Sequence, residues 1–208
     1  MSIKKIFDVF RKAQCSGCGT AATLDRYGFC GACGPQVILL ENPPGAETLH
    51  ILKYEGPVKD AIHNFKYNRK TYYGKRFARL ASDFIRENGT DNFDLIIPVP
   101  LHWKKEFKRG FNQSAIVAIN VARLLKKKCL CGILVKVKNT VSQTELNESE
   151  RKKNVKGTFR VKRAGRIKGK KILLLDDVYT SGATTSEAKK TLLAAGASSV
   201  TILTLTRA

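Results

Sequence analysis

The chain has 208 residues, and 43% of them are hydrophobic. This length and composition suit one ordinary domain with a buried core plus a small accessory module, and they exclude disorder throughout. The 38 Lys and Arg residues outnumber the 17 Asp and Glu residues, which leaves a formal net charge of +21. Such a surplus is typical of proteins that bind polyanions, and it argues against an enzyme with a neutral surface.

The amino terminus shows no export signal, because Asp8 and Arg11 interrupt the apolar run before it reaches the length of a signal peptide. The longest charge-free stretch covers 16 residues from Thr191 to Thr206 and includes Gly196, so it is too short for an ordinary membrane-spanning helix. We therefore expect a soluble, cytoplasmic protein that is not integral to a membrane. Peripheral attachment at the cytoplasmic face of the inner membrane is the alternative.

Apolar residues at the amino terminus recur at helical spacing, at Ile3, Ile6, Phe7 and Phe10. This pattern predicts a short amphipathic helix over residues 3–12. Its apolar stripe would pack against a neighbouring element.

Four cysteines then form two similar pairs, CSGC and CGAC, separated by 11 residues: Cys15, Cys18, Cys30 and Cys33. Glycines in and beside each pair let the backbone turn so that both sulfurs face one ion, and four thiolates complete the closed tetrahedron of a structural zinc site. We predict a small zinc-ribbon-like module whose metal replaces a core that so few residues cannot build. Two disulfides or a redox-active pair are the alternatives, disfavoured where thiols stay reduced.

The turn residues Asn42-Pro43-Pro44-Gly45 break regular structure, and we place a domain boundary there, between residues 1–45 and 46–208. Beyond it, strand and helix patterns alternate, which predicts an α/β fold with a parallel sheet covered by helices on both faces. The expected strands cover residues 37–40, 49–54, 94–99, 133–137, 157–162, 171–175 and 200–205. The expected helices cover residues 58–65, 75–87, 113–127 and 184–195.

Two further cysteines, Cys129 and Cys131, follow a run of lysines. We interpret them as strand-edge or buried thiols, because unpaired cysteines are usually packed as small apolar residues. A second metal site is the less favoured alternative.

The apolar strand over residues 172–175 leads directly to two adjacent acids, Asp176 and Asp177, at the strand's carboxyl end, where ligands bind in open parallel sheets. Residues 179–184 then combine hydroxyl side chains with Gly182 before a helix whose N-terminal amides favour a phosphate. Acids beside phosphate donors fit a sugar phosphate such as ribose 5-phosphate. Helix capping is the alternative, but it does not explain two consecutive acids.

At these residues the sequence resembles a known class, since LLLDDVYTSGAT is similar to the phosphoribosyl-pyrophosphate signature of type I phosphoribosyltransferases. The segments IIPVPLHWKKEFKRGFNQS and KNTVSQTELNESERKKNVKGTFRV and the four-cysteine module resemble the ComF family of competence proteins, in the same order and spacing. The resemblance covers nearly the whole chain and implies a type I phosphoribosyltransferase fold. One departure is Ser181, where many relatives carry Thr, and it keeps the hydroxyl donor.

The resemblance implies a role for each matching segment. The acids would hold the ribose hydroxyls of phosphoribosyl pyrophosphate and the loop its 5-phosphate, with Mg²⁺ bound alongside. The implied ligand-binding residues are Asp176, Asp177, Val178, Tyr179, Thr180, Ser181, Gly182, Ala183 and Thr184. The implied pyrophosphate loop consists of Val99, Pro100, Leu101 and His102, and Lys105, Lys108 and Arg109 would supply positive charge beside it.

The polar residues 138–154 resemble a hood that closes over the diphosphate and brings Arg151 or Lys152 toward it. An ordinary surface loop is the alternative. His102 lacks a paired acid in the sequence, which argues against a general base, and Asn112 and Gln113 serve either helix capping or the site.

The basic residues gather in the middle of the chain, where residues 101–171 hold 21 basic and four acidic side chains, a net charge of +17. One diphosphate needs only a few cations, so this excess implies a longer anion such as single-stranded DNA. The aromatic residues Trp103, Phe107, Phe111 and Phe159 lie among these charges and could stack on bases, although at least half of them are expected in the core. The candidate DNA-binding residues are Lys105, Lys108, Arg109, Lys126, Lys127, Lys128 and Lys153.

Two functional classes follow from these features. In the first, which the family resemblance favours, the protein handles incoming single-stranded DNA in natural transformation, binds phosphoribosyl pyrophosphate and Mg²⁺, and works with a competence helicase or other DNA-uptake proteins. In the second, it is an active phosphoribosyltransferase with an acceptor that the sequence does not identify. A structural zinc module in a membrane-associated uptake complex is a third reading.

Overall fold

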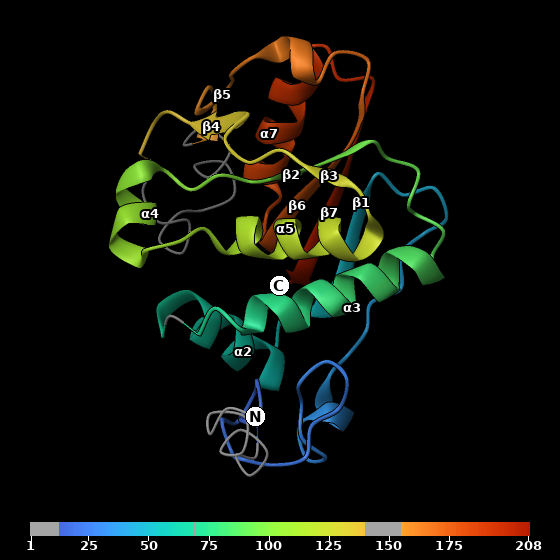
Figure 1. The fold of residues 1–208 in the computed structure, drawn as a ribbon, viewed down its shortest axis with the longest axis vertical. Coiled ribbons are helices and arrows are strands. Elements are labelled where there is room, and N and C mark those ends of the chain that lie inside the picture. Colours follow the sequence, from blue (N-terminus) through green and yellow to red (C-terminus); the bar gives the residue numbers. More distant parts are fainter. Residues whose placement is uncertain (1–12, 69, 140–154) are drawn as a thin grey trace, which may run out of the picture.

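The structure is a computed structural model, and it describes residues 13–68, 70–139 and 155–208. A five-stranded sheet forms its centre, with the strand order β1-β7-β6-β2-β3 and every neighbouring pair parallel (Figure 1). The strands are β1 (Thr48–Lys53), β2 (Leu95–Pro98), β3 (Lys128–Cys129), β6 (Lys171–Tyr179) and β7 (Ser199–Arg207). Hydrophobic runs such as ILLL in β6 suit this position, because both faces of the sheet are covered.

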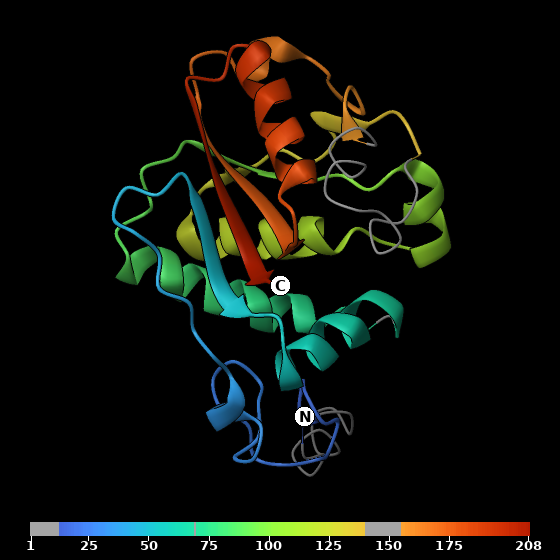
Figure 2. The same cartoon turned by 180° about the vertical axis from the view of Figure 1, so that it is seen from behind.

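Alternate residues of each central strand enter two separate cores. Leu173 and Leu175 of β6 pack on the face covered by α2 (Gly56–Tyr67), α3 (Tyr73–Glu87) and α5 (Gln113–Leu125). Ile172 and Leu174 pack on the opposite face with α7 (Ala183–Ala194), which lies in front of the sheet in Figure 2. The expected parallel α/β fold with helices on both faces is therefore confirmed.

Two of the expected strands do not join the central sheet. β4 (Leu134–Lys136) and β5 (Phe159–Val161) pair with each other, antiparallel, in a separate two-stranded sheet. Their buried residues Leu134 and Phe159 belong to the core on the α7 face. The predicted hood over residues 138–154 falls between these two strands in the sequence, and its residues 140–154 lie outside the described residues.

The other differences from expectation are local. The helix α4 (Trp103–Arg109) was not predicted, because its seven residues are too few to show a periodic pattern. Residues 37–40 form no regular strand, but Leu39 makes an isolated antiparallel bridge to Leu52 at the outer edge of β1. The predicted helix over residues 3–12 lies outside the described residues.

The four-cysteine module packs directly against α2 and α3. Its Cys15 and Phe29 belong to the same apolar cluster as Phe65 and Phe77 of these helices. The module and the sheet therefore share a core, and the boundary after residue 45 stays a prediction.

Arg76 on α3 forms hydrogen bonds with residues near both cysteine pairs of the module. Its Nη1 donates hydrogen bonds of 2.9 Å to the Gln14 carbonyl and 2.7 Å to Ser16 Oγ, and it also reaches the Gly28 carbonyl at 3.4 Å. A second contact is the ion pair between Arg26 and Asp83, at 2.6 Å. Polar contacts thus reinforce the apolar junction between the module and α3.

Candidate functional site

A pocket of 440 Å³ lies at the carboxyl ends of β2 and β6, the edge at which open parallel sheets bind ligands. Segments far apart in the sequence supply its walls, since α2, α4, α5, β4 and the start of α7 all reach it. The residues lining the pocket are Tyr54, His63, Lys66, Tyr67, Val99, Pro100, Leu101, Lys105, Arg109, Gln113, Ser114, Lys136, Asp176, Asp177, Val178, Tyr179, Thr180, Gly182, Thr184 and Thr185.

The two acids end the buried part of β6 and point to different partners. Asp176 Oδ1 accepts hydrogen bonds of 2.9 Å from Ser114 Oγ and 2.9 Å from the Asp177 backbone amide. Asp177 forms an ion pair of 2.9 Å with Lys66 on α2, and both side chains of this pair are largely buried. Each acid is therefore held in place by a side chain from a helix, Ser114 of α5 for Asp176 and Lys66 of α2 for Asp177.

Burial and the neighbouring carboxylate of Asp177 raise the pKa of Asp176 to about 7, although its hydrogen bonds and Lys66 act in the opposite direction. Burial by itself would lower the pKa of Lys66, but the adjacent carboxylates outweigh it and the pKa is raised. Lys66 thus keeps its charge, while Asp176 exchanges a proton near neutral pH.

The loop after the acids leads into the N-terminus of α7. Gly182 is the N-cap with φ of 73°, and a Cβ atom there would collide with the Tyr179 ring, so both the backbone conformation and the close approach require glycine. No side chain caps the helix at this residue. Ser181 Oγ is buried without a hydrogen-bond partner among the described residues, and Ser181 does not line the pocket, whereas Thr180 and Thr184 of the same loop do.

The predicted pyrophosphate loop follows β2 on the opposite side of the pocket. Asn112 fixes it, because its Nδ2 donates a 3.0 Å hydrogen bond to the Val99 carbonyl while its Oδ1 caps α5 by accepting from the Ala115 amide. His102 is buried and does not line the pocket, and its Nδ1 accepts from the Lys104 amide as the N-cap of α4. Burial and the lysines nearby lower its pKa, so His102 positions α4 as a neutral side chain.

Four basic side chains from three elements line the pocket. Lys105 and Arg109 come from α4, Lys136 from β4 and Lys66 from α2. Arg109 Nη1 donates to Gln113 Oε1 at 2.7 Å, and Gln113 Nε2 is buried without a partner among the described residues. Four basic and two acidic side chains thus line the same pocket.

Sequence reasoning missed Lys66 and Lys136. Lys105 and Arg109, predicted both as DNA-binding candidates and as positive charge beside the pyrophosphate loop, line the pocket. Of the two missed residues, Lys136 has the more unusual environment, because burial and the charge of Lys105 lower its pKa to about 8. A single lysine at the end of a three-residue strand has no sequence pattern that marks it as a site residue. The positions of the predicted hood residues Arg151 and Lys152 lie outside the described residues.

The four predicted zinc ligands come together as one cluster. Their Sγ atoms all lie within 4.8 Å of one another, and Cys15, Cys30 and Cys33 are buried while Cys18 is exposed. Hydrogen bonds from Thr20 lower the pKa of Cys18 to about 6, which favours a thiolate. Four cysteine sulfurs at this separation can hold a metal ion, and the chemistry of the donor set favours zinc.

The remaining candidate DNA-binding residues do not form one surface with the pocket. Lys126, Lys127 and Lys128 line a second hollow of 510 Å³ at the amino ends of β2, β3 and β6, together with Arg166 and Lys170. We call this hollow the amino-edge groove. The length of β6 places it about 20 Å from the pocket. Lys153 lies outside the described residues.

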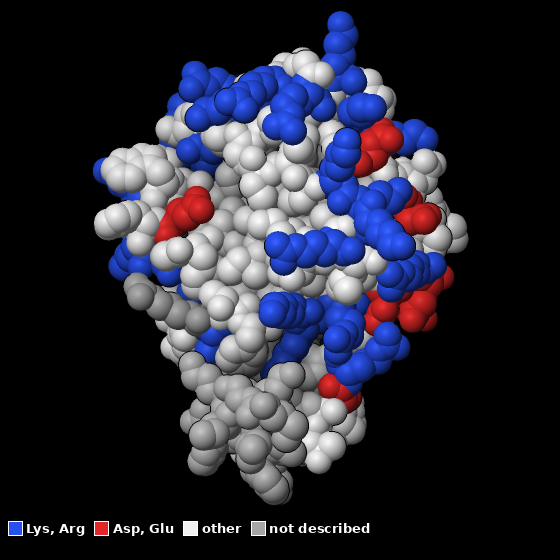
Figure 3. Space-filling view, viewed as in Figure 1, with Lys and Arg blue, Asp and Glu red and all other residues white. Residues whose placement is uncertain are grey.

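Basic side chains extend this region beyond the groove. Figure 3 shows Lys and Arg residues along the top of the molecule, over the turn η3 (Ala164–Arg166), and over the right half of the same face. Lys127 is less available than its neighbours, because its Nζ donates to the carbonyls of Asp91 and Phe93, both at 3.0 Å. Lys128 and Lys170 are exposed.

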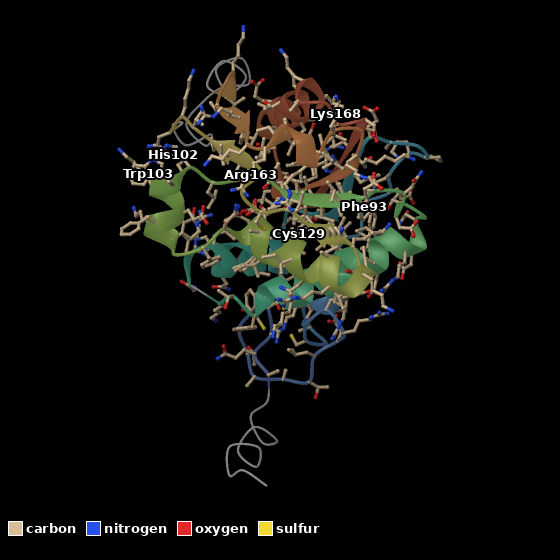
Figure 4. All side chains as sticks on the ribbon, turned by 45° about the horizontal axis from the view of Figure 1, so that its top comes forward. Phe93, His102, Trp103, Cys129, Arg163 and Lys168 are labelled. Atoms are coloured by element: carbon tan, nitrogen blue, oxygen red, sulfur yellow. The ribbon has the colours of Figure 1, made fainter. Side chains whose placement is uncertain are left out.

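The four aromatic residues of the basic segment divide evenly. Trp103 and Phe107 on α4 are 65% and 87% exposed, and Trp103 stands at the outer end of the molecule beside His102 (Figure 4). Phe159 is buried, and Phe111 stacks on Phe65 with ring centroids 5.8 Å apart. The expectation that at least half belong to the core is confirmed, and only Trp103 and Phe107 are available to a partner.

The fold and the pocket define an α/β protein with a pocket of basic, acidic and hydroxyl side chains at the carboxyl edge of a parallel sheet, joined to a four-cysteine module. The chain is 30% identical over 200 residues to the DNA utilization protein YhgH of Escherichia coli O6:H1, covering 94% of this chain and 85% of that protein. It therefore belongs to the ComF family of competence proteins. Competence protein F of Haemophilus influenzae is 28% identical over 214 residues, which cover 96% of this chain and 93% of the relative.

A further relative is the competence protein ComFC of Streptococcus pneumoniae, 31% identical over 159 residues that cover 76% of this chain and 66% of that protein. No protein-family model matches the chain. Solved structures with a similar fold include a purine phosphoribosyltransferase from Pyrococcus horikoshii, with a TM-score of 0.43, 13% identity and coverage of 78% of this chain and 89% of that one. An adenine phosphoribosyltransferase has a TM-score of 0.46 and 10% identity, with 68% and 73% covered. Among the described helices, none has the length and apolar character needed to cross a membrane.

Proposed function

We propose that the pocket binds phosphoribosyl pyrophosphate together with Mg²⁺. The observation that carries this proposal is that Asp176 and Asp177 line the same pocket as Thr180, Gly182 and Thr184, the loop residues that lead into α7. Carboxylates repel a bare phosphate, whereas a sugar phosphate presents hydroxyl groups to the acids and its phosphate to the helix N-terminus. An anion without hydroxyl groups would have no favourable partner for the two acids.

The cations on the opposite wall suit the diphosphate of the same ligand. Lys105, Arg109 and Lys136 surround the space beside the loop of residues 99–101, where several negative charges would otherwise be buried unpaired. Gln113 Nε2 supplies one more donor. Mg²⁺ would bind with the ligand, because phosphate and carboxylate oxygens are the ligands that this cation prefers.

The relatives are named for DNA utilization and competence, and a role of this protein in DNA uptake follows from its membership in the family. We propose that it handles incoming single-stranded DNA in the cytoplasm during natural transformation. Two surface features support this role: the amino-edge groove supplies cations for a phosphate backbone, and Trp103 and Phe107 offer exposed rings for base stacking.

Calorimetric titration with phosphoribosyl pyrophosphate and Mg²⁺, with and without single-stranded DNA, tests both parts of the proposal. Ligand binding that needs Mg²⁺ and survives in the absence of DNA would support the pocket assignment. If the protein is also a transferase, pyrophosphate should be released when a suitable nucleophile is added. Absence of heat at ligand concentrations in the millimolar range would contradict the pocket assignment.

We expect ligand affinity to depend on pH in a bell-shaped way. Below pH 7 Asp176, with a pKa of about 7, becomes protonated and loses its charge for the ribose hydroxyls and Mg²⁺. Above pH 8 Lys136, with a pKa of about 8, loses the charge that attracts the diphosphate. Binding should therefore be tightest between pH 7 and 8, as measured by calorimetry from pH 6 to 9.

The substitution Asp176→Asn should flatten the acidic side of this profile and leave the alkaline side unchanged. The matching substitution Lys136→Gln should do the reverse. Identical profiles for both variants and the unmodified protein would assign the titration to the ligand's own phosphates.

DNA binding should weaken steeply as salt rises, because each neutralised phosphate on a single strand contributes about −0.7 to the log–log slope. The double substitution Lys128→Glu and Lys170→Glu in the amino-edge groove should make that slope shallower by about 1.4. A gel-shift series between about 50 and 200 mM salt measures the change.

The control variant carries Lys59→Glu and Lys75→Glu, which make the same change in net charge at exposed positions away from the groove. If both double variants lose affinity equally, only the overall charge matters and the groove is not the DNA site. The affinity for phosphoribosyl pyrophosphate should stay within about twofold in either variant, because screening weakens exposed charges beyond about 10 Å at these salt concentrations.

A further inference from the structure

The cysteines outside the metal cluster form a close pair. Cys129 ends the edge strand β3, and Cys131 lies in the turn that follows it (Figure 4 labels Cys129). Their Sγ atoms are 3.8 Å apart, within hydrogen-bonding distance for sulfur. Cys131 is exposed to solvent, whereas Cys129 is partly buried.

We propose that Cys129 and Cys131 form a peroxide-sensitive dithiol, in which Cys131 is the reacting thiol and Cys129 resolves the product into an intramolecular disulfide. The two residues are separated by one residue, and a segment of that length spans at most about 7 Å between Cα atoms, the upper limit for a disulfide. Gly132, with φ of 77°, lets the chain turn after Cys131, so the exposed thiol can move toward its partner.

The local environments of the two cysteines differ in the way that the roles of reacting and resolving thiol require. A hydrogen bond from Cys129 lowers the pKa of Cys131 to about 7, against smaller effects of burial and of Glu106. The same hydrogen bond and burial raise the pKa of Cys129, which keeps its proton. Cys131 is therefore a partly ionised, accessible thiol, and thiolates are the form that oxidants attack.

The reaction balances with a hydroperoxide as the oxidant. The Cys131 thiolate attacks one peroxide oxygen, an S–O bond forms, the O–O bond breaks, and the leaving hydroxide takes up a proton. Cys129 Sγ then attacks the resulting sulfenic sulfur, an S–S bond forms, the S–O bond breaks, and the hydroxide leaves as water with the proton of Cys129. Two thiols lose two electrons in total, and the peroxide is reduced to its hydroxyl product and water.

A metal site at this position is disfavoured by the structure. Among the described residues, the only group of three or more cysteine, histidine or acidic side chains close enough to share an ion is the four-cysteine cluster. An ion at Cys129 and Cys131 would have two protein ligands, fewer than the four of a structural zinc site.

The oxidation state of the pair can be measured on one tryptic peptide. Trypsin cleaves after Lys128 and Lys136, and the peptide between these sites contains Cys129 and Cys131 and no further cysteine. Metal-loaded, full-length protein is treated with increasing hydrogen peroxide, alkylated and digested. We expect the peptide to lose both alkylation sites together and to become lighter by two hydrogen atoms relative to its unmodified form. Dithiothreitol should restore alkylation.

The substitution Cys129→Ala separates the two roles. We expect this variant to accumulate a sulfenic acid at Cys131 that dimedone traps, and to react roughly threefold more slowly because its thiolate loses a hydrogen bond. Cys131→Ser should show no rapid oxidation at Cys129. Overoxidation of Cys131 in the unmodified protein, a disulfide between two chains, or full alkylation after peroxide would each overturn the proposal.

Discussion

Replacing both acids of the pocket, as Asp176→Asn and Asp177→Asn, should weaken phosphoribosyl pyrophosphate binding by about 30-fold to 1000-fold, which corresponds to roughly 2–4 kcal/mol for two charge-assisted hydrogen bonds. Asparagine keeps the shape of the side chain, so Ser114 and the backbone amide of residue 177 retain an acceptor. Lys66, however, loses its charged partner and remains as an additional cation in the pocket. Calorimetry at pH 7.5 with Mg²⁺ measures the change in affinity.

Comparing the affinities for phosphoribosyl pyrophosphate and for inorganic phosphate in this double variant tests whether the acids bind the sugar. If the acids served only to position Lys66, their neutralisation would leave more positive charge in the pocket, and inorganic phosphate and phosphoribosyl pyrophosphate would both bind more tightly. Loss of affinity for the sugar ligand, with unchanged or tighter binding of phosphate, supports the assignment of the acids to the ribose hydroxyls. The control is Asp60→Asn, which removes an exposed charge from α2 and should leave both affinities unchanged.

The second large effect is expected at the four-cysteine cluster. Cys15 is completely buried, its Sγ accepts from the Cys30 amide at 3.3 Å, and its carbonyl accepts from the Tyr73 hydroxyl at 3.5 Å. Cys15→Ser should therefore remove a metal ligand and disturb the junction with α3 at the same time. Structural zinc sites contribute about 10–16 kcal/mol to the folding of small modules, so we expect the melting temperature to fall by roughly 10 °C or more.

Because the module and the sheet share a core, Cys15→Ser should also affect ligand binding in the pocket. Two separate domains with a boundary at residues 42–45, as predicted from the sequence, would let the module unfold without affecting the pocket. In the structure the module packs on α2, and α2 presents Lys66 to Asp177, so its unfolding should also weaken ligand binding.

Metal analysis and thermal melting check the expectation. The intact protein should contain one equivalent of zinc, and a chelator should lower its melting temperature as the substitution does. Cys131→Ser is the control, because this exposed thiol lies outside the cluster and should change the melting temperature by no more than about 2 °C. Protein that contains less than half an equivalent of zinc and melts normally would contradict a structural metal.

The local features of this protein could be predicted from the sequence by itself. The apolar run of β6, the acids that end it and the loop before α7 are contiguous, so strand pattern, turn chemistry and helix start are all visible within a dozen residues. The paired CxxC segments are equally local. The alternation of strands and helices was sufficient for the fold class, because crossover connections of this length return each strand parallel to the last.

Only the tertiary structure decided which distant residues meet. Lys66 lies on α2 and Lys136 on the short strand β4, yet both line the pocket that holds the acids of β6, while Lys126 and Lys128 lie at the opposite edge of the same sheet. The sequence showed one basic segment, and the structure divides it between a pocket and a groove. The physical reason is that hydrophobic periodicity and turns record how each residue contacts its near neighbours, whereas the edge of the sheet that a side chain reaches depends on strand order and direction, which are set by packing across the whole chain.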